Sequence, residues 1–596
     1  MKTSKSAAKI FYLLLVLGTA MNVLGTQRYV DISSSNQHAP FTSWATAATN
    51  IQDAIDIATN GDEVVVNDGV YQVGARLVNG AGASNRVAIT LPLLVRSVNG
   101  PSVTTIQGYQ FPSKKVGLTA VRCAYVTNGA VLTGFTLTGG ATHDYFTSME
   151  TPEQLSGGGV WCPSASAIVS NCVLSGNAAS WYGGGIYGGT LQNCTVSGNS
   201  ASEEGGGAAY SAMTNCDLNG NSATSVGGAT YYCALTNCTI ENNSAYTGAG
   251  AGYGTAVACT FSGNNAGSSG GGAAYGTLID CTLTGNSAHA NGGGMNQATA
   301  IHCTLSGNSA VQSGGAAGSS TLSRCTLSNN SAKYGGGTYS SSLDNCLVTY
   351  NAAAYYGGGI DGGSAVNCTV LYNSAVTSGG GTAYGTIQNS IIYYNTAPDG
   401  NCASSSSLSY CCTTPIYGSP THCIGADPQL DGNNQLQDGS PCLNIGNNSY
   451  ATAAVDLGGS ARIVNGTVDL GAFELPTLAT RAFRSWLQGY NLPGDGSADY
   501  LDSDADGMNN WQEYIADTNP TDPTSVLQIV SGPSASSQDV TWLSVFTRTY
   551  TLQRTTDLRS FSVLETNIPG QYGTTTFTDT NMTGSQQFFY RVLVEQ

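Results

Sequence analysis

Charged side chains are scarce in this chain of 596 residues, at 9% of the total, against roughly 25% in average globular proteins. Lys and Arg number only 19 against 36 Asp and Glu, which gives a formal net charge of −17. Nucleic acids and anionic membranes both attract clustered cationic side chains. The composition therefore argues against both classes of partner and predicts a surface made mainly of Gly, Ser, Thr and Asn.

Long apolar runs are also lacking after the N-terminus. Residues 1–25 contain three lysines, an apolar run over residues 10–17 and small residues up to Gly25, which are the parts of a secretory signal peptide. No later run is long enough to span a bilayer. We therefore expect cleavage near Gly25, no transmembrane segment in the mature chain, and a secreted or cell-surface location.

What the middle of the chain does contain is a repeat of 21 or 22 residues. Each unit has a cysteine, an apolar residue two positions later and an asparagine three positions after that. The cysteines are Cys172, Cys194, Cys216, Cys238, Cys259, Cys281, Cys303, Cys325, Cys346 and Cys368, with Ser390 in the next slot. The asparagines are Asn177, Asn199, Asn221, Asn243, Asn264, Asn286, Asn308, Asn330, Asn351, Asn373 and Asn395. A fixed period without a helical pattern is typical of a stacked solenoid.

The spacing within one unit predicts a right-handed parallel β-helix. In an extended segment such as residues 191–196, Cys194 and Val196 point to the same face, which we expect to be the dry interior. Glycine triplets recur about half a unit away, where a tight corner requires positive φ. The unit is too short for a helical crossover. Stacked asparagines would then hydrogen-bond up and down a column.

The stacked cysteines leave two chemical states open. Disulfides are common in exported proteins, but coils in register place Cβ atoms about 4.8 Å apart, against about 3.8 Å in a disulfide. We therefore expect thiols that pack as small hydrophobic groups. A bridge is more expected in the irregular sequence that follows, among Cys402, Cys411, Cys412, Cys423 and Cys442, although the pairing is not defined.

One segment has the spacing of a calcium-binding loop. Oxygen-bearing side chains fall at loop positions 1, 3, 5, 9 and 12, a glycine at position 6 allows the sharp turn, and position 7 offers a carbonyl. These residues are Asp502, Asp504, Asp506, Asn510 and Glu513, with Gly507 and Met508. We expect a structural Ca²⁺ ion between short helices at residues 481–487 and 508–515. The alternative is an acidic, solvated turn.

A catalytic site is harder to identify. Cleavage of acidic polysaccharides needs paired carboxylates, or a bound cation with a basic residue, and the charged residues of the repeats are scattered. Asp280, His302 and Arg324 precede the cysteine in three successive coils and would form a row about 5 Å apart. Such a row is either a site or an exposed ion pair. The insertion at residues 140–157 is a further candidate, or a plain surface excursion.

Tyr210, Tyr232, Tyr253 and Tyr275 form a second predicted column. Each lies five residues after the first glycine of its corner, so the four rings should stack in consecutive coils. Such a ladder could serve as a platform for sugar rings. Stacking between neighbouring strands would equally explain it.

Several segments resemble known families. The helix near residues 51–58, followed by GDEVVV at residues 61–66 and DGVY at residues 68–71, resembles the opening of pectin-lyase-like β-helices. The repeats resemble those of polymorphic outer-membrane proteins, whose β-helical passengers act as adhesins. Residues 427–474 resemble the closing segment of choice-of-anchor Q proteins, which implies an exported product. The metal loop resembles those of EF-hands, dockerins and thrombospondin type 3 repeats.

These observations predict an all-β protein with four parts. We expect a signal peptide (1–25), a single-stranded β-helix with an N-terminal helical cap (26–475), a two-helix calcium-binding joint (476–523) and a small β-sandwich (524–596). Within the β-helix, regular coils occupy about residues 171–395 and an irregular closing segment follows. The expected function is that of an adhesin-like or structural surface protein without catalysis. A polysaccharide lyase or hydrolase, or a glycan-binding protein, is the alternative.

Overall fold

The computed structural model describes residues 25–78, 81–144, 151–403, 405–417, 420–464, 466–494, 498–533, 538–556, 560–581 and 587–595. The predicted signal peptide lies outside these residues, apart from Gly25. The chain forms two compact units. The first comprises the described residues up to 321 together with residues 327–341. The second comprises residues 322–326 and the described residues from 342 onward. Among the described residues, no helix is long and apolar enough to cross a bilayer.

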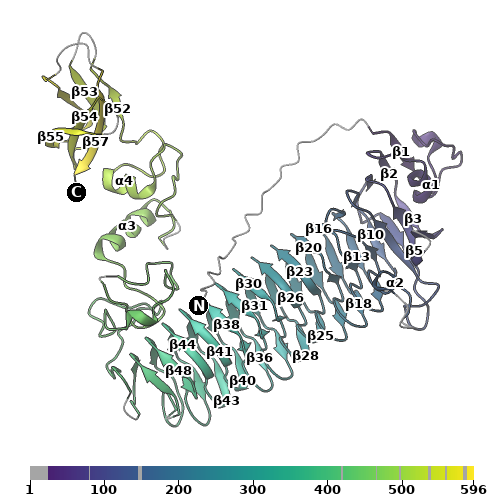
Figure 1. The fold of residues 1–596 in the computed structure, drawn as a ribbon, viewed down its shortest axis with the longest axis horizontal. Coiled ribbons are helices and arrows are strands. Elements are labelled where there is room, and N and C mark those ends of the chain that lie inside the picture. The colour runs from purple at the N-terminus through teal and green to yellow at the C-terminus, as the bar shows by residue number, and fades with distance from the viewer. Residues whose placement is uncertain are drawn as a thin grey trace, which may run out of the picture. The chain divides into compact units, whose positions relative to one another are not determined.

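The first unit is a parallel β-helix, which confirms the predicted fold. One coil comprises β16 (Thr190–Gln192), β17 (Thr195–Ser197), β18 (Ser200–Ala201) and β19 (Ala208–Ala209). Each strand pairs in register with its equivalent one coil later, so that Val196 lies over Leu218 and Ala201 over Ala223. Figure 1 shows β16 beside β20 (Ala212–Thr214) and β23 (Thr230–Thr236) as successive rungs. Like residues therefore stack over like residues.

Left-handed backbone marks the turns of every coil. The residue before each repeat cysteine from Cys172 to Cys303 has a φ of 48° to 54°. Asn favours this conformation more than most residues do, because its short polar side chain can hydrogen-bond locally. This explains why that slot is usually Asn. The first glycine of each corner also has positive φ, for example 66° at Gly205.

The asparagine ladder is present as predicted. In the first unit, each ladder side chain from Asn177 to Asn308 donates from Nδ2 to Oδ1 of the next asparagine at 2.9–3.1 Å. The same Oδ1 also accepts from the backbone N–H of the preceding asparagine. The side chains are 0–1% exposed. The ladder thus satisfies polar groups inside a dry turn.

The cysteine column points into the interior, as expected, with exposed fractions of 0–2% from Cys172 to Cys368. None of the 18 cysteines forms a disulfide in the structure, so the bridge expected among Cys402, Cys411, Cys412, Cys423 and Cys442 is not formed. Several thiols donate to the carbonyl two residues earlier, as Cys259 does to Val257 at 3.2 Å. The column therefore combines apolar packing with a weak hydrogen bond to the strand.

A short helix covers the N-terminal coil, as predicted. Helix α1 (Ile51–Asp56) begins at Asn50, whose side chain accepts from the Gln52 N–H, and it buries Ile51, Ala54 and Ile55. Beside it, β1 (Gln27–Val30) pairs with β2 (Glu63–Val66) in parallel. The antiparallel pair β4 (Arg76–Val78) and β5 (Ala81–Ile89) was not anticipated. The insertion after Gly140 includes α2 (Pro152–Leu155), and its residues 145–150 lie outside the described residues.

The second unit begins with further coils of the same kind. Strands β42 (Leu347–Thr349), β45 (Thr369–Leu371) and β49 (Ile391–Tyr393) pair in parallel and in register. Asn351 and Asn373 continue a ladder, with Asn373 donating to Asn395 at 2.9 Å. The closing segment buries a polar cluster in which Arg462 donates to the carbonyls of Asp469 and Gly471.

Two helices and two small sheets follow in the second unit. Helices α3 (Leu478–Gly489) and α4 (Asn510–Ala516) share a core that includes Phe483 and Leu487. One sheet contains β52 (Ile529–Ser531), β53 (Asp539–Ser544) and β56 (Gly573–Thr578); the other contains β54 (Thr549–Thr555), β55 (Ser562–Pro569) and β57 (Phe589–Glu595). Trp542 and Tyr550 from the two sheets meet in one core. The domain boundaries given above remain predictions.

Candidate functional site

The acidic loop before α4 brings its first three carboxylates together. One oxygen each from Asp502, Asp504 and Asp506 lies within 4.8 Å of the other two. Gly507 has a φ of 98°, as the sharp turn at the sixth loop position requires. The Asn509 side chain accepts from the Gln512 N–H and so starts α4 at the ninth position. The loop therefore has the local geometry expected of a cation-binding loop.

Buried oxygens without hydrogen-bond partners face this loop. Asn510 and Glu513 are 0% exposed, and Asn510 Oδ1, Glu513 Oε2, Asp504 Oδ2 and Asp506 Oδ2 have no partner among the described residues. Burial and the nearby charges of Asp504 and Asp506 raise the pKa of Glu513 to about 7. An orphaned buried acceptor is costly. A cation would satisfy these oxygens and neutralise the repulsion between them.

The donor set fits a hard cation. Carboxylate and amide oxygens, with a backbone carbonyl at Met508, are the ligands that Ca²⁺ takes at high coordination number. Copper and zinc prefer nitrogen and sulfur ligands, which this loop lacks apart from the Met508 thioether. That sulfur instead accepts from the Leu527 N–H at 3.3 Å, on the chain leading to β52. These ligand assignments remain a proposal.

Of the predicted row of Asp280, His302 and Arg324, the first two side chains are in contact. His302 Nδ1 lies 2.6 Å from Asp280 Oδ1, and both side chains are more than half exposed. Both residues occupy the left-handed slot before the cysteine, with φ values of 54°. Arg324 has the same backbone conformation but belongs to the second unit. The geometry of the first two is that of an exposed ion pair, which carries little energy.

The predicted tyrosine column is confirmed as a stack. Ring centroids are 5.6 Å apart for Tyr210–Tyr232, 4.7 Å for Tyr232–Tyr253 and 4.8 Å for Tyr253–Tyr275, with interplanar angles of 3°, 6° and 22°. Tyr210 and Tyr232 remain 45% and 47% exposed. Because the rings stack along the coils, they cover each other's faces and present their edges and hydroxyls to solvent.

All four tyrosines adopt left-handed backbone conformations, with φ of 51° to 61°. For a non-glycine residue this costs roughly 1–2 kcal/mol, whereas each stacked pair contributes about 0.5–1.5 kcal/mol beyond burial. The two terms are of similar size. Other coils place Gly188, Gln297 and Ser319 in the same slot, so the fold does not require tyrosine there.

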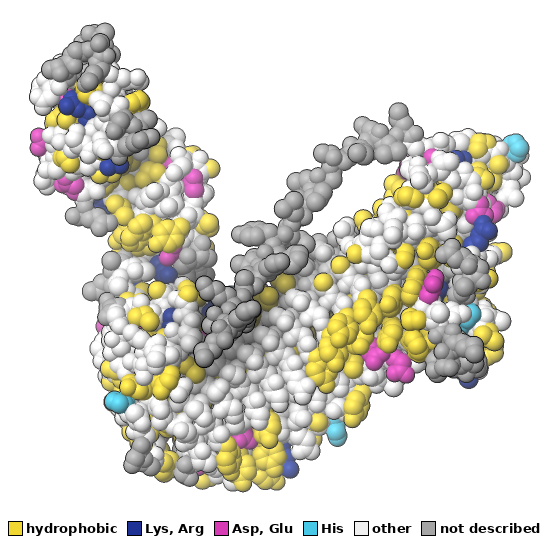
Figure 2. Space-filling model, viewed as in Figure 1, with side chains coloured by type: hydrophobic (Ala, Val, Ile, Leu, Met, Phe, Trp, Pro, Cys, Tyr) yellow, Lys and Arg dark blue, Asp and Glu magenta, His cyan; other side chains and the backbone are white. Residues whose placement is uncertain are grey.

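A second set of aromatic rings lies against this column. Tyr182 and Tyr231 are nearly parallel to each other, at 12° and 5.9 Å, and nearly perpendicular to Tyr210, at 80° and 89°. Trp161 stacks on Tyr187 at 4.4 Å. We call the following residues the aromatic face: Trp161, Trp181, Tyr182, Tyr187, Tyr210, Tyr231, Tyr232, Tyr253 and Tyr275. Figure 2 shows a broad hydrophobic area on the first unit with acidic side chains at its edge.

Glu203 and Glu204 adjoin the aromatic face. Glu204 forms a parallel bridge with Tyr182, and the Gly183 N–H donates to the Glu204 carbonyl at 3.2 Å. Burial, followed by the charge of Glu203, raises the pKa of Glu204. Sequence reasoning missed both glutamates and the outer rings, although two adjacent acids directly before a glycine corner, and the Tyr231-Tyr232 doublet, were visible signals.

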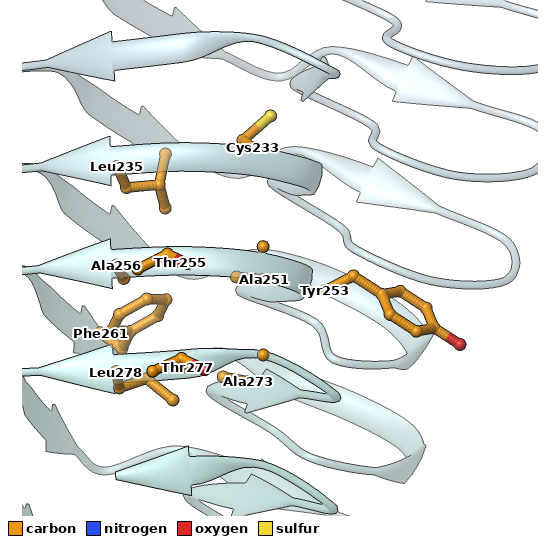
Figure 3. Close-up of a pocket in the computed structure, with 12 residues that line it drawn as sticks. Cys233, Leu235, Ala251, Tyr253, Thr255, Ala256, Phe261, Ala273, Thr277 and Leu278 are labelled. Carbon is orange, nitrogen blue, oxygen red and sulfur yellow. The ribbon is translucent and has the colours of Figure 1, made fainter. Parts of the chain in front are cut away.

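The interior beneath the tyrosine column offers no room for a substrate. A cavity of about 10 Å³ is lined by Leu235, Tyr253, Phe261 and neighbouring residues, and a single water needs roughly 10–15 Å³. Figure 3 shows the Tyr253 ring pointing away from the cavity, while Leu235 and Phe261 lie within the coils. Any ligand of this region would therefore bind on the surface.

Comparison with known proteins gives a partial match. The profile of the family described as periplasmic copper-binding protein (NosD) matches residues 164–321. No curated protein matches the chain. Among solved structures, pectate lyase Pel9A is 10% identical, with 76% of this chain and 96% of that chain covered and a TM-score of 0.25. The A-module of Azotobacter vinelandii mannuronan C-5 epimerase AlgE4 is 14% identical, with 67% and 100% covered and a TM-score of 0.25. Similarity at this level does not identify an activity.

Proposed function

We propose that this chain is an exported surface protein, adhesin-like or structural, that binds an extracellular glycan without catalysis. The observation that carries the proposal is the aromatic face: partly exposed tyrosines stack in a left-handed slot that other coils fill with Gly, Gln or Ser. Exposed aromatic surface on a rigid scaffold is suited to binding. The predicted signal peptide supports export, and the matched family is described as periplasmic.

A non-catalytic role is favoured by where the charges lie. In the repeats, Asp217, Glu241 and Asp280 lie in different coils, and Asp280 pairs with His302 in solvent. Glycosidases need two carboxylates facing one bond. The exception is Glu203 with Glu204, which are adjacent in sequence and lie beside Tyr182 of the aromatic face.

A degradation and binding panel on the mature chain tests this function. We expect retention of at least one polysaccharide with no new reducing ends and no unsaturated products. Binding should fall in Tyr231→Ala, which gives this position the Ala209 side chain of the preceding coil, and should persist in Asp280→Asn. Cleavage of a uronate polymer that is abolished in Asp280→Asn would overturn the proposal in favour of a lyase or hydrolase.

We also propose that the loop at residues 502–513 binds a structural Ca²⁺ ion through Asp502, Asp504, Asp506, Met508, Asn510 and Glu513. The ion would fix the start of α4 relative to the loop and stabilise the joint. Its chemical contribution would be to neutralise clustered carboxylates. The copper named in the NosD description suits these oxygen ligands poorly.

Calorimetry with CaCl₂, and separately with CuCl₂, tests the metal assignment. We expect Ca²⁺ binding and a raised melting temperature of the C-terminal region. Glu513→Gln should abolish both effects, whereas Asp522→Asn, a nearby exposed acid bonded to Thr524, should retain them. An unchanged Ca²⁺ titration in Glu513→Gln would refute the site.

A further inference from the structure

The stretch of sequence that carries the aromatic face has acidic residues of one charge sign, and the buried Arg122 lies over the Trp161 ring, 5.5 Å from its centroid. Between Arg122 and Arg324 the sequence contains no Lys or Arg, while it contains eight Asp and Glu residues. Arg122 itself is 1% exposed and donates to backbone carbonyls such as that of Ser156. Polyuronates would therefore meet only negative charge here. The surface is electrostatically complementary to a cationic ligand.

The two carboxylates beside the aromatic face are those of Glu203 and Glu204. Among the described residues, no ion pair or side-chain hydrogen bond involves Glu203 or Glu204. Glu203 is exposed and Glu204 is half-buried. Partial desolvation without a counter-ion is unfavourable for a carboxylate. A bound cation would relieve this cost, so the pair is suited to receive a positive group from outside.

Glu204 lies close enough to the rings to act with them. Burial, together with the negative charge of Glu204, raises the pKa of Tyr182. The same carboxylate contributes, after burial and neighbouring tyrosines, to the raised pKa of Tyr231 and Tyr253. The phenols therefore stay protonated, and their hydroxyls can donate hydrogen bonds to a ligand on the surface. One ligand group can thus contact rings and carboxylates together.

We propose that the aromatic face, together with Glu203 and Glu204, binds an extended polymer whose repeating units carry ammonium groups, the chemistry of a de-N-acetylated amino-sugar chain. The rings recur with every coil at 4.7–5.6 Å along the tyrosine column. A repeating surface matches a repeating ligand, because each further unit of the polymer adds an equivalent contact. The inference rests on the proposed binding function and defines its ligand class.

Binding of a chitosan oligosaccharide to the full chain at mildly acidic pH tests this assignment. The comparison ligands are the fully N-acetylated oligosaccharide, which keeps the sugar rings but lacks the charge, and an oligogalacturonate, which reverses it. We expect the chitosan oligosaccharide to bind most tightly, with an affinity that falls as salt is added. The oligogalacturonate should not bind.

Variants separate the contribution of the two carboxylates to binding from that of the aromatic rings. Glu203→Gln combined with Glu204→Gln should weaken chitosan binding by about tenfold, because both ion pairs with the ammonium groups of the ligand are lost. It should leave binding of the N-acetylated ligand unchanged. Tyr231→Ala should weaken both. Tyr372→Asn, in a stacked tyrosine column of the second unit, is the matched control and should change neither.

Three outcomes would overturn the inference: absence of chitosan binding, equal affinity for the charged and N-acetylated ligands, or unchanged chitosan affinity in the double glutamine variant. If the N-acetylated ligand binds and Tyr231→Ala abolishes it, the binding function stands while the ammonium assignment fails. Cleavage of any ligand would instead refute the non-catalytic function. Circular dichroism of each variant confirms that the β-helix is intact.

Discussion

Replacing Asn264 by alanine tests the physical basis of the fold. Asn264 is 0% exposed, and its Nδ2 donates to Ile240 O and to Asn286 Oδ1, both at 2.9 Å. Its Oδ1 accepts from Asn243 N at 3.0 Å and from Asn243 Nδ2 at 2.9 Å. Alanine removes all four hydrogen bonds at once and adds no new partner.

The expected loss of stability in Asn264→Ala follows from the polar groups that lose their hydrogen-bond partners. Asn243 Nδ2 keeps its bond to Leu218 O, and Asn286 Oδ1 keeps the Asn264 N–H, but the Asn243 backbone N–H loses its ladder acceptor inside the coil. An orphaned buried donor costs about 1–3 kcal/mol and each other lost bond about 0.5–1.5 kcal/mol. We therefore expect destabilisation by about 4 kcal/mol, which is large for a single substitution.

The neighbouring residue provides the control. Asn265 is exposed and accepts one hydrogen bond, from Ser287 Oγ at 2.9 Å. Asn265→Ala should cost no more than about 1 kcal/mol. Asn264→Asp keeps the shape and the acceptor but loses both donated bonds and buries a charge. It should be at least as destabilising as alanine at neutral pH, because shape alone does not hold the ladder.

Two measurements check these values. Urea unfolding followed by circular dichroism reports the stability change, and hydrogen exchange reports local opening, since stacked repeats can unfold in parts. A local loss of about 4 kcal/mol corresponds to about thousandfold faster exchange near residues 240–290. If Asn264→Ala and Asn265→Ala shift both readouts equally, the asparagine ladder does not stabilise the coils and the reasoning is refuted.

Three further predictions concern other features. Burial raises the pKa of Glu474 to about 8, so the folded state binds this proton more tightly than the unfolded state. The free energy of unfolding should therefore fall as pH rises from about 5 to about 8, and Glu474→Gln should flatten that pH profile in urea titrations. Tyr372, at a φ of 56°, should tolerate Asn within about 1 kcal/mol, whereas Tyr372→Val should lower the melting temperature because a β-branched residue disfavours this backbone. Cys259→Ser should lower the free energy of unfolding by less than about 1.5 kcal/mol, because Ser390 already fills the equivalent slot and donates to Gln388 O. Cys259→Leu should lower it by about 1–3 kcal/mol through overpacking, and an equal loss in both variants would contradict this account.

Residue alternation and loop spacing within short segments explain why much of the second unit could be predicted. Alternating apolar and polar residues mark β53, β54, β56 and β57 in the sequence, within the small β-sandwich predicted for residues 524–596. Strand β55 was missed because most of its side chains are exposed, so no apolar alternation marks it. The metal loop was recognised from spacing alone, but the buried, unpartnered oxygen of Glu513 became evident only from its packing.

The period of the sequence by itself determined the β-helix, its thiol-lined interior and its asparagine ladder. A strict repeat places equivalent residues one rung apart, and that regularity specifies register without any knowledge of distant contacts. Only the tertiary structure decided which surface residues act together. Tyr182 and Glu204 hold the same slot, directly before the glycine corner, in successive coils. Tyr231 lies in another slot, and no sequence spacing predicts that its ring stacks with that of Tyr182. They meet because the winding of the coils and the direction of each side chain bring them onto one surface.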